Sequence, residues 1–563
     1  MKIEMQASGW RSLWPLGVVV FVVWAVLLTT ASQSTLWDRD EARYATASLE
    51  MENSGNLLYP TFNQELRAFK PVMIYWLMSA AIHAFGPSEW SVRLVSTLAI
   101  AGVCLLTGLI AREFLGSGMT AAAIAGTSPM LILTGTAATT DATLLLSILL
   151  SQWVFVRAWL DGPRRWHVPV MGAAIGMALL IKGPVGLVIP VLSIATALVL
   201  SRGRSEVGPF GLRLAGAAGL GILIFLAWGL PANAATGGEY WRIGVAERLP
   251  RRIFSAMEGH GGQGWLPFLL HLPYYPLVLA VGFLPWTIYL SLVPGSFRNA
   301  ARPMSTKGWA RSPEGLRILL LAMILPVFVL MTLVVSKLPH YIQPVFPWFA
   351  ILVAAALAGI RRRSRHQLVA GRMRWSLLVF GVPSVLAVLA ILALPWIWAP
   401  ADVFRSSGTI LGLFLLGWLL VLGVNLWRGR IFSAVWAHAI GMLMFTLGAA
   451  LFVLPTIETF AKPAQRLGIE VGPLIPSGAE IAVFGWYEPS LHFYLGARPI
   501  QRLHDPVSLQ EWLSGPGPRV LILNESVSSG LTLPPAGYRP LATQTGIDHV
   551  GGKTTRLTAF LRE

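Results

Sequence analysis

Apolar runs long enough to cross a lipid bilayer recur along the chain from Trp14 to Leu454. A helix needs roughly 20 mostly apolar residues to span the hydrocarbon core. The pattern predicts thirteen membrane-spanning helices, over 13–31, 91–111, 117–135, 140–158, 167–182, 185–201, 212–230, 276–296, 316–336, 341–360, 376–396, 408–427 and 431–454. The apolar run 71–87 is assigned to the membrane interface, because a crossing there would place Arg112 on the wrong side.

The orientation of these spans follows from the basic residues between them. Arginines and lysines gather at the N-terminus and in every second connection, for example around residues 157–165, 298–317 and 361–374. Basic residues favour the cytoplasmic side of a membrane. We therefore expect the N-terminus inside and, after an odd number of crossings, the C-terminus outside.

The pattern changes at Thr456. Short β-branched stretches at 480–484 and 518–523 have Gly, Pro and Asn between them, and they alternate with helix-like pieces such as 508–512. Such alternation is typical of a small α/β domain. We predict two parts, a membrane domain over 1–455, with outer loops at 32–90 and 231–275, and an outer α/β domain over 456–563.

The composition agrees with a membrane protein. Hydrophobic residues make up 55% of the 563 residues and charged residues only 12%, against about 25% charged in soluble domains. The net charge of +17 would suggest nucleic acid in a soluble protein. Here the arginines lie between spans, where they contact anionic lipid, so no nucleic-acid partner is expected. The single cysteine, Cys104, excludes an internal disulfide.

Ionisable residues at the outer ends of spans are costly and therefore candidates for function. They are Asp40, Glu41 and Arg43 after the first span, Lys70, Asp141, Lys182, the group Lys337, His340 and Tyr341, and Arg248, Arg251 and His260 in the loop 231–275. Three of the seven lysines occur in this set, each followed within two residues by proline. The set indicates a cationic site for phosphate or pyrophosphate. The alternative for any one lysine is contact with lipid headgroups.

Carboxylates beside such a phosphate site suit glycosyl transfer from a phospholipid. A carboxylate orients the acceptor and steadies the positive charge that develops on the sugar, and cations neutralise the departing phosphate. Simpler roles stay open, since Asp40 and Glu41 could favour a helix N-terminus and Asp141 could cap a helix. The sequence has no Walker-type loop, HExxH or CxxC, which argues against ATP-driven transport and a thiol-ligated zinc. A flippase for a lipid-linked precursor is the competing hypothesis.

The order of these motifs resembles a known family. Asp40-Glu41-Ala42-Arg43-Tyr44-Ala45, Lys70-Pro71, Thr140-Asp141, Lys182-Gly183-Pro184, His260-Gly261-Gly262, Phe283-Leu284-Pro285-Trp286 and Ser336–Tyr341 occur in this order. Over roughly residues 10–460 the chain resembles bacterial members of the dolichyl-phosphate-mannose–protein mannosyltransferase superfamily. Within it, the chain is most similar to the 4-amino-4-deoxy-L-arabinose (aminoarabinose) transferases of lipid A. Val72 departs from the family pattern, which often has a second proline there.

The resemblance implies a GT-C fold with about thirteen transmembrane helices and a periplasmic active site in the bacterial inner membrane. It implies a donor sugar on undecaprenyl phosphate and lipid A as acceptor, with another sugar or a protein or glycan acceptor left open. No cofactor is expected, with a divalent cation as the alternative, and the chain is expected to be a monomer. The implied site is catalytic Asp40, Glu41 and Asp141; phosphate-binding Lys70, Arg248, Arg251, Lys337 and Tyr341; and further pocket residues Arg43, Lys182, His260 and His340.

Overall fold

The structure is a computed structural model, and it describes residues 13–201, 207–248, 250–251, 269–293, 309–361, 373, 375, 377–397, 399–525, 535–547 and 552–563. The chain forms two compact units. The first, here called the helical unit, comprises Met1–Thr29, Ala68–Met73 and Ser96–Leu447. The second, the mixed unit, comprises Thr30–Arg67, Ile74–Val95 and Gly448–Glu563.

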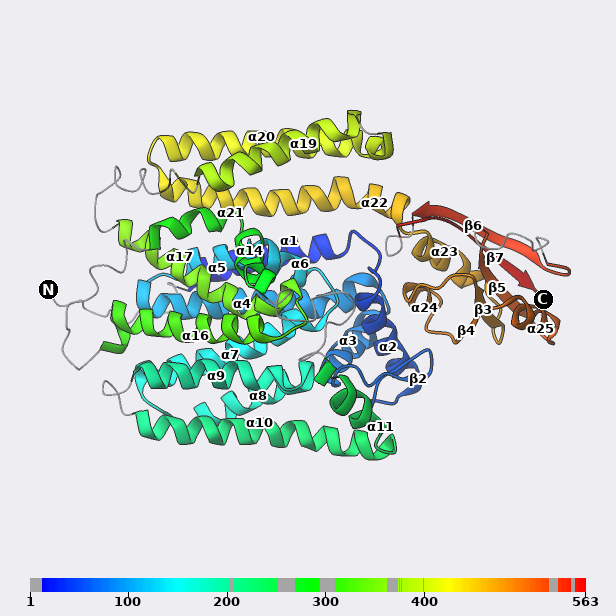
Figure 1. Cartoon of the computed structure of the whole chain (residues 1–563), viewed down its shortest axis with the longest axis horizontal. Helices are drawn as coiled ribbons and strands as arrows, with labels where there is room; N and C mark the ends of the chain where they lie inside the picture. The colour runs from blue at the N-terminus through cyan, green and yellow to red at the C-terminus, as the bar shows by residue number, and fades with distance from the viewer. Residues whose placement is uncertain are drawn as a thin grey trace. The chain divides into compact units, whose positions relative to one another are not determined.

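The helical unit is built from long helices that lie side by side and from shorter helical segments between them (Figure 1). In chain order they are α1 (Trp14–Ala31), α4 (Glu89–Leu115), α5 (Met119–Gly126), α6 (Pro129–Gly135), α7 (Thr140–Asp161), α8 (His167–Lys182), α9 (Val185–Leu200), α10 (Val207–Ala235), α11 (Glu239–Trp241), η2 (Arg242–Glu247), α14 (Tyr274–Gly282), η3 (Trp286–Leu292), η4 (Trp309–Arg311), α16 (Pro313–Leu333), η5 (Pro339–Val345), α17 (Phe346–Arg361), η6 (Leu377–Gly381), α19 (Val382–Ile397), η7 (Ala399–Phe404), α20 (Arg405–Trp427) and α21 (Ile431–Gly448). The first residues of α4 belong to the mixed unit.

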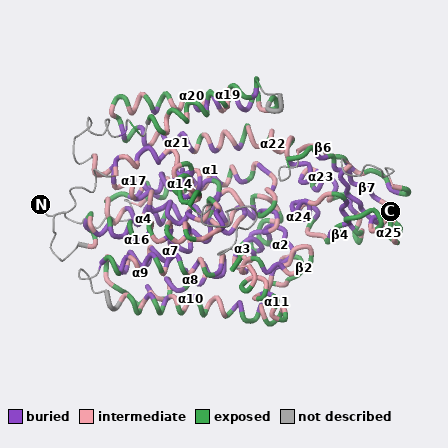
Figure 2. Tube along the Cα trace, viewed as in Figure 1, coloured by how far each residue is buried: buried purple, intermediate pink, exposed green. Residues whose placement is uncertain are grey.

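The helices of this unit differ in how much of their surface other helices cover. In α7, 72% of the 18-residue apolar stretch that could cross a membrane is buried. In α10 only 17% of the corresponding stretch is buried, although its mean hydropathy is 1.9. Figure 2 shows exposed residues along α10, α19 and α20 and buried ones along α7. Leu212 is 79% exposed, and large apolar groups at this exposure are stable against lipid rather than water. The outer helices therefore match a membrane protein, as predicted.

Within the described residues, nine helices are long and apolar enough to cross a membrane, or ten if the bent pair α14 and η3 is one span. The exact number of thirteen stays a prediction. The remaining predicted spans are helical but short or broken. α8 and α9 have 16 residues each, and the run 117–135 is divided into α5 and α6.

Proline and glycine cause these breaks. α14 and η3 meet at 109° around Pro285, which lacks the N–H that would continue the helix. α8 ends at Gly183, whose φ of +68° suits a residue without a side chain. The apolar run 71–87 forms α3 (Met73–Phe85), whose 13 residues are too few to cross a bilayer.

The mixed unit contains a five-stranded sheet and its helices. After α2 (Asp40–Ser54), the hairpin β1 (Thr61–Phe62) and β2 (Glu65–Leu66), and α3, the chain returns as α22 (Leu454–Ala461), α23 (Pro463–Val471), η9 (Gly472–Leu474), β3 (Glu480–Phe484), α24 (Ser490–Tyr494), β4 (Ile500–Leu503), α25 (Pro506–Ser514), β5 (Arg519–Asn524), β6 (Arg539–Ile547) and β7 (Thr554–Arg562). The sheet order is β4-β3-β5-β7-β6.

Strands β4, β3 and β5 of this sheet are parallel, and β7 and β6 are antiparallel to their neighbours. The apolar stretches at 480–484 and 518–523 are the buried strands β3 and β5, so the predicted C-terminal sheet is confirmed. The boundary proposed at 455/456 falls inside α22. The compact unit that contains the sheet also takes in 30–67 and 74–95, which the two-part division had placed with the membrane domain.

Candidate active site

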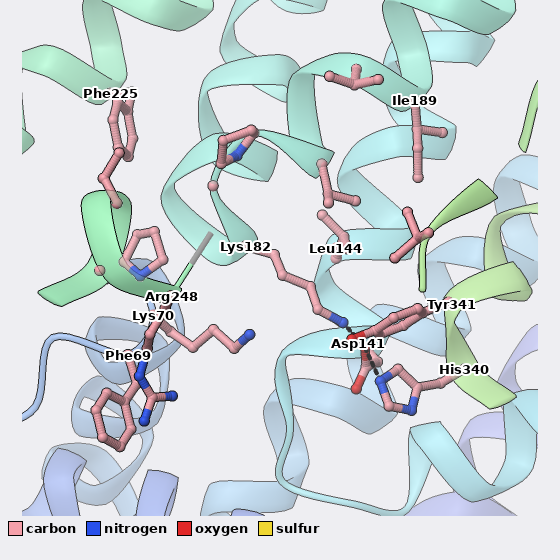
Figure 3. A pocket seen from close by; sticks show the side chains of 18 of the residues that line it. Phe69, Lys70, Asp141, Leu144, Lys182, Ile189, Phe225, Arg248, His340 and Tyr341 are labelled. Atoms are coloured by element: carbon pink, nitrogen blue, oxygen red, sulfur yellow. Dashed lines mark hydrogen bonds and ion pairs between the residues drawn. The ribbon is translucent and has the colours of Figure 1, made fainter. Parts of the chain in front are cut away.

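A cavity in the helical unit collects many of the polar residues selected from the sequence. Its ionisable lining residues come from five regions of the chain, and they are Lys70, Asp141, Lys182, Tyr240, Arg248, His340 and Tyr341. Most of the remaining lining is apolar or aromatic, including Phe69, Leu144, Ile189, Phe225 and Trp228 (Figure 3). The cavity therefore combines a cationic group with a long apolar wall.

Asp141 and Lys182 form the centre of this group. Asp141 lies in the first turn of α7 and Lys182 is the last residue of α8, and Nζ lies 2.5 Å from Oδ1. Both side chains are nearly buried, at 12% and 10% exposure. His340 Nε2 lies 3.8 Å from the same oxygen, and Lys182 Nζ lies 5.5 Å from the ring centroid of Tyr341. Asp141 thus acts as the counter-ion of Lys182.

Lys70 and Arg248 lie together at another part of the cavity. The Arg248 guanidinium carbon is 3.2 Å from the ring centroid of Phe69, a cation–π contact, and the Lys70 side chain points into the cavity (Figure 3). Tyr240 donates a hydrogen bond of 2.6 Å to the carbonyl of Lys70. Gly244 lies so close that a Cβ there would be 2.9 Å from the carbonyl oxygen of Ala68. The start of the loop 231–275 therefore packs directly on the Lys70 segment.

Two other residues of the sequence-derived set, Lys337 and Arg251, do not line this cavity. Lys337 is 4% exposed and donates to the carbonyls of Met331, Thr332 and Val334 at 3.0, 2.6 and 2.5 Å. An ammonium group has three donors, so this lysine caps the C-terminal end of α16, in contrast to the expected phosphate ligand. Burial lowers the pKa of Lys337. Arg251 is exposed and absent from the cavity lining, and His260 lies outside the described residues.

In the mixed unit, Glu41 is a structural ion-pair partner. Glu41 is 3% exposed, and its oxygens accept two hydrogen bonds of 2.7 Å from the fully buried Arg93. The N–H of Trp37 donates a third, at 2.8 Å. These partners occupy both carboxylate oxygens. The expected catalytic role of Glu41 does not fit this geometry.

Arg93 also fixes the chain that leads to Asp40. Its guanidinium donates to the carbonyls of Ala31, Ser34 and Thr35 at 2.6, 2.6 and 2.9 Å. Sequence reasoning missed Arg93, although it is a basic residue at the outer end of the predicted span 91–111, against the orientation bias of the other arginines.

Residues near the C-terminus hold the same segment. Within the mixed unit, Lys462 Nζ donates to the carbonyl of Thr35 at 2.8 Å, and Gln465 Nε2 donates to the carbonyl of Leu36 at 3.2 Å. Tyr494 accepts a hydrogen bond of 2.8 Å from the N–H of Leu36. No sequence pattern points to these residues, because each contact joins positions more than 400 residues apart.

Asp40 follows this fixed segment as the first residue of α2. Its side chain is 76% exposed, and its nearest basic partner is Arg43, one turn later, at 4.0 Å. The long distance and high exposure make this a weak ion pair. Asp40 thus places an exposed carboxylate, with only one weak ion pair, directly after a segment held by several hydrogen bonds.

A divalent cation was the alternative to a metal-free site. Within the ranges that the structure describes, no three His, Cys, Asp or Glu side chains gather in a way that could hold a metal ion. The cation stays a prediction.

Comparisons with known proteins agree with the motif order. The family model for dolichyl-phosphate-mannose-protein mannosyltransferase matches residues 69–228. An undecaprenyl phosphate-alpha-4-amino-4-deoxy-L-arabinose arabinosyl transferase 2 of Sodalis glossinidius is 30% identical over 482 residues, 82% of this chain and 80% of that protein. A transferase of the same name from Aeromonas salmonicida is 32% identical over 65% of this chain and 64% of its own length.

The fold matches as well. A crystal structure of ArnT from Cupriavidus metallidurans bound to undecaprenyl phosphate superposes with a TM-score of 0.75 at 20% identity, over 98% of each chain. The apo form of that protein gives a TM-score of 0.70. The predicted GT-C fold is thereby confirmed. Through its identity to curated relatives and the order of its motifs, the chain belongs to the family of undecaprenyl phosphate-4-amino-4-deoxy-L-arabinose arabinosyl transferases.

Proposed function

We propose that the chain is an integral-membrane glycosyltransferase that moves 4-amino-4-deoxy-L-arabinose from undecaprenyl phosphate to a phosphate of lipid A. The observation that carries the proposal is the cavity of the helical unit. It places Lys70, Lys182 and Arg248 beside an apolar wall, which matches the charge and the hydrocarbon of a polyprenyl phosphate. The relatives' names supply the sugar.

The donor phosphate is the part of the substrate that this cavity suits. Lys70 and Arg248 supply charge-assisted donors, and the Tyr341 hydroxyl supplies a neutral one. Phe69 holds the Arg248 guanidinium by cation–π contact, so its position is set before the donor binds. Negative charge grows on the leaving phosphate in the transition state, and pre-positioned cations stabilise that charge most.

The transfer step is a displacement at the anomeric carbon of the sugar. An ionised oxygen of the acceptor phosphate attacks this carbon, the bond from the carbon to the undecaprenyl phosphate oxygen breaks, and that oxygen keeps the electron pair. An ionised acceptor needs no general base, whereas a hydroxyl acceptor would need one. Asp40 then orients the acceptor and stabilises the positive charge on the sugar. Asp141 holds the Lys182 side chain in place through their ion pair.

The orientation of the protein in the membrane follows from the arginine-rich connections between its spans. They put the cytoplasm at the connections 157–165, 298–317 and 361–374, which leaves the loops 32–90 and 231–275 and the C-terminal sheet on the periplasmic side of the inner membrane. A cysteine-accessibility experiment at Asn53 and Ser514, both in the mixed unit, tests this orientation. Labelling of both by a membrane-impermeant reagent in intact spheroplasts is expected.

The lysine and arginine of the cavity can neutralise the leaving phosphate without a metal ion, so we expect transfer to continue after chelation. A cation-assisted mechanism is the alternative. Purified enzyme treated with EDTA and assayed with and without added Mg²⁺ or Mn²⁺ separates the two. Loss of transfer on chelation, restored by one ion, would assign the divalent cation.

The central test is lipid A from cells with and without the gene, analysed by mass spectrometry and by polymyxin sensitivity. We expect the gene to add the mass of one or two aminoarabinose units and to raise polymyxin resistance. The variant Asp40→Asn is expected to fold and to lose transfer. Near-normal modification by this variant would remove Asp40 from the mechanism, and an unmodified lipid A with another glycan changed would redirect the acceptor assignment.

A further inference from the structure

A cluster in the mixed unit has no role in the chemistry described so far. It lies at the carboxyl ends of the parallel strands β3 and β4, the edge where α/β sheets commonly bind ligands. The segment that follows β3 carries Tyr487, Ser490 and His492, and the third residue of β4 is Arg502. We call Arg43, Arg67, Tyr487, His492 and Arg502 the arginine cluster.

Several polar atoms beside this edge are buried without hydrogen bonds of ordinary geometry. They include the Ser490 hydroxyl, the Tyr487 hydroxyl and both ring nitrogens of His492, and Ser490 and His492 are 0% exposed. Buried polar groups are nearly always hydrogen-bonded, and an unpaired one costs about 1–3 kcal/mol. Burial raises the pKa of Tyr487 to about 12 and lowers that of His492 to about 4. Both are therefore neutral at pH 7, and each can donate one hydrogen bond.

Aromatic rings connect the arginines to these groups. The Arg502 guanidinium carbon lies 3.4 Å from the ring centroid of Tyr487, whose ring is 5.6 Å from that of His492. The His492 ring is 5.0 Å from Phe62, and the guanidinium carbon of Arg67 is 5.8 Å from the same Phe62 ring. The Arg502 guanidinium thus lies on the face of Tyr487, and Arg67 lies near Phe62 and donates from Nε to the Tyr75 hydroxyl at 3.2 Å.

Arg43 completes the cluster and connects it to Asp40. Burial lowers the pKa of Arg43, and the like charge of Arg67 lowers it further. The counter-charge nearby is weak, because Asp40 is 4.0 Å from Arg43 and largely exposed. Among the other carboxylates, Asp38 accepts hydrogen bonds from Ser490 N and Gln465 Nε2 at 2.8 and 3.0 Å, and Glu488, beside Tyr487 in the sequence, is buried at 2% exposure. An added dianion would relieve the repulsion.

We propose that the arginine cluster binds the phosphate group of the acceptor, a phosphorylated glycolipid, and presents one of its oxygens beside Asp40. The inference rests on the proposed function, and it concerns the acceptor rather than the undecaprenyl phosphate. A phosphate monoester has several oxygens in tetrahedral geometry, which guanidinium forks bind bidentately. Arg43 lies one helical turn after Asp40, so a phosphate held by Arg43 lies next to the carboxylate that orients it. The C-terminal domain then supplies part of the acceptor site.

The test uses the full-length protein in detergent and the variant Arg502→Gln. Arg502 is exposed, so its replacement is compatible with folding. The matched control is Arg539→Gln, an exposed arginine on β6 at the opposite edge of the same sheet. With the donor saturating, we expect Arg502→Gln to raise the KM for phosphorylated acceptor about tenfold, with little change in kcat or in the donor KM. Arg539→Gln is expected to match the wild type.

A binding measurement keeps the two proposals separate. Titration of a soluble glucosamine disaccharide carrying two phosphates, followed by tryptophan fluorescence or calorimetry, needs no turnover. Saturable binding that Arg502→Gln weakens about tenfold supports the inference even if no sugar is transferred. An unchanged acceptor KM and affinity in Arg502→Gln, a raised donor KM instead, or no binding to the wild type would overturn it. Transfer by the wild type in such a case would leave the proposed function standing.

Discussion

The buried pair of Glu41 and Arg93 gives the sharpest prediction, because it separates a structural carboxylate from the neighbouring Asp40, which we propose takes part in transfer. Glu41→Gln keeps the shape of the side chain and removes its charge. Its amide nitrogen then faces the guanidinium donors of Arg93, which is 1% exposed. Removing one partner of a buried ion pair leaves the other charge uncompensated and costs about 3–5 kcal/mol. That is a large part of the 5–15 kcal/mol that typically stabilises a domain.

Thermal unfolding of the purified protein, followed by tryptophan fluorescence, measures this loss. For a unit of this size, each kcal/mol shifts the midpoint by roughly 2–4 °C. We therefore expect Glu41→Gln to lower the midpoint of the mixed unit by about 6–20 °C. Transfer activity per folded molecule at low temperature should stay within about threefold of the wild type, because Arg93 and Trp37 already occupy both oxygens of Glu41.

The matched control is Glu52→Gln on the same helix. Glu52 contacts the exposed His83, whose side chain is 79% exposed, and the loss of such a pair costs at most about 1 kcal/mol. The reasoning would be refuted if Glu41→Gln unfolded at the wild-type temperature and lost transfer a hundredfold. Glu41 would then belong to the reacting groups.

Three further predictions concern the cavity and the C-terminal sheet. Lys182→Met leaves Asp141 charged and nearly buried, so it should lower folded yield by a stability loss of about 3–5 kcal/mol, and adding Asp141→Asn should restore yield without activity. Arg248→Gln should raise the donor KM about tenfold while Arg251→Gln changes it less than twofold, since only Arg248 lines the cavity; equal effects would contradict the assignment. Burial lowers the pKa of His492 to about 4, from about 6.5 in the unfolded chain. The contribution of this neutral histidine to the free energy of unfolding is therefore fully present above pH 6.5 and falls by up to about 3 kcal/mol between pH 6.5 and 4. Unfolding curves of His492→Asn should show a weaker dependence on pH in this range.

The sequence was sufficient for much of the fold, and the reason is physical. Membrane spans and buried strands are local apolar patterns, so α7, β3 and β5 appear close to their predicted positions. The break between α14 and η3 depends on Pro285 and on packing around it, which a window of hydropathy averages away. The apolar run 276–296, predicted as one span, therefore forms the bent pair α14 and η3.

The site shows the same division between local and distant information. Asp141 and Lys182 were selected as charges at the ends of neighbouring spans, and the structure brings them to 2.5 Å. Glu41 and Lys337 were selected by the same rule, yet their partners are a distant arginine and the carbonyls of a helix end. Position along the chain identifies a costly charge, but only the folded structure shows which group compensates it.

The segment before Asp40 has a consequence for how the protein is made. Thr35 donates to Glu458 through its N–H and its hydroxyl, at 3.2 and 2.6 Å, and the two residues are 423 positions apart. At about 5–20 residues per second, a ribosome needs roughly 20–85 s to bridge that interval. These hydrogen bonds to the segment before Asp40 can therefore form only after Glu458 has been synthesised. A nascent chain that is still being inserted, or one cut short before Glu458, therefore lacks these hydrogen bonds to the segment before Asp40.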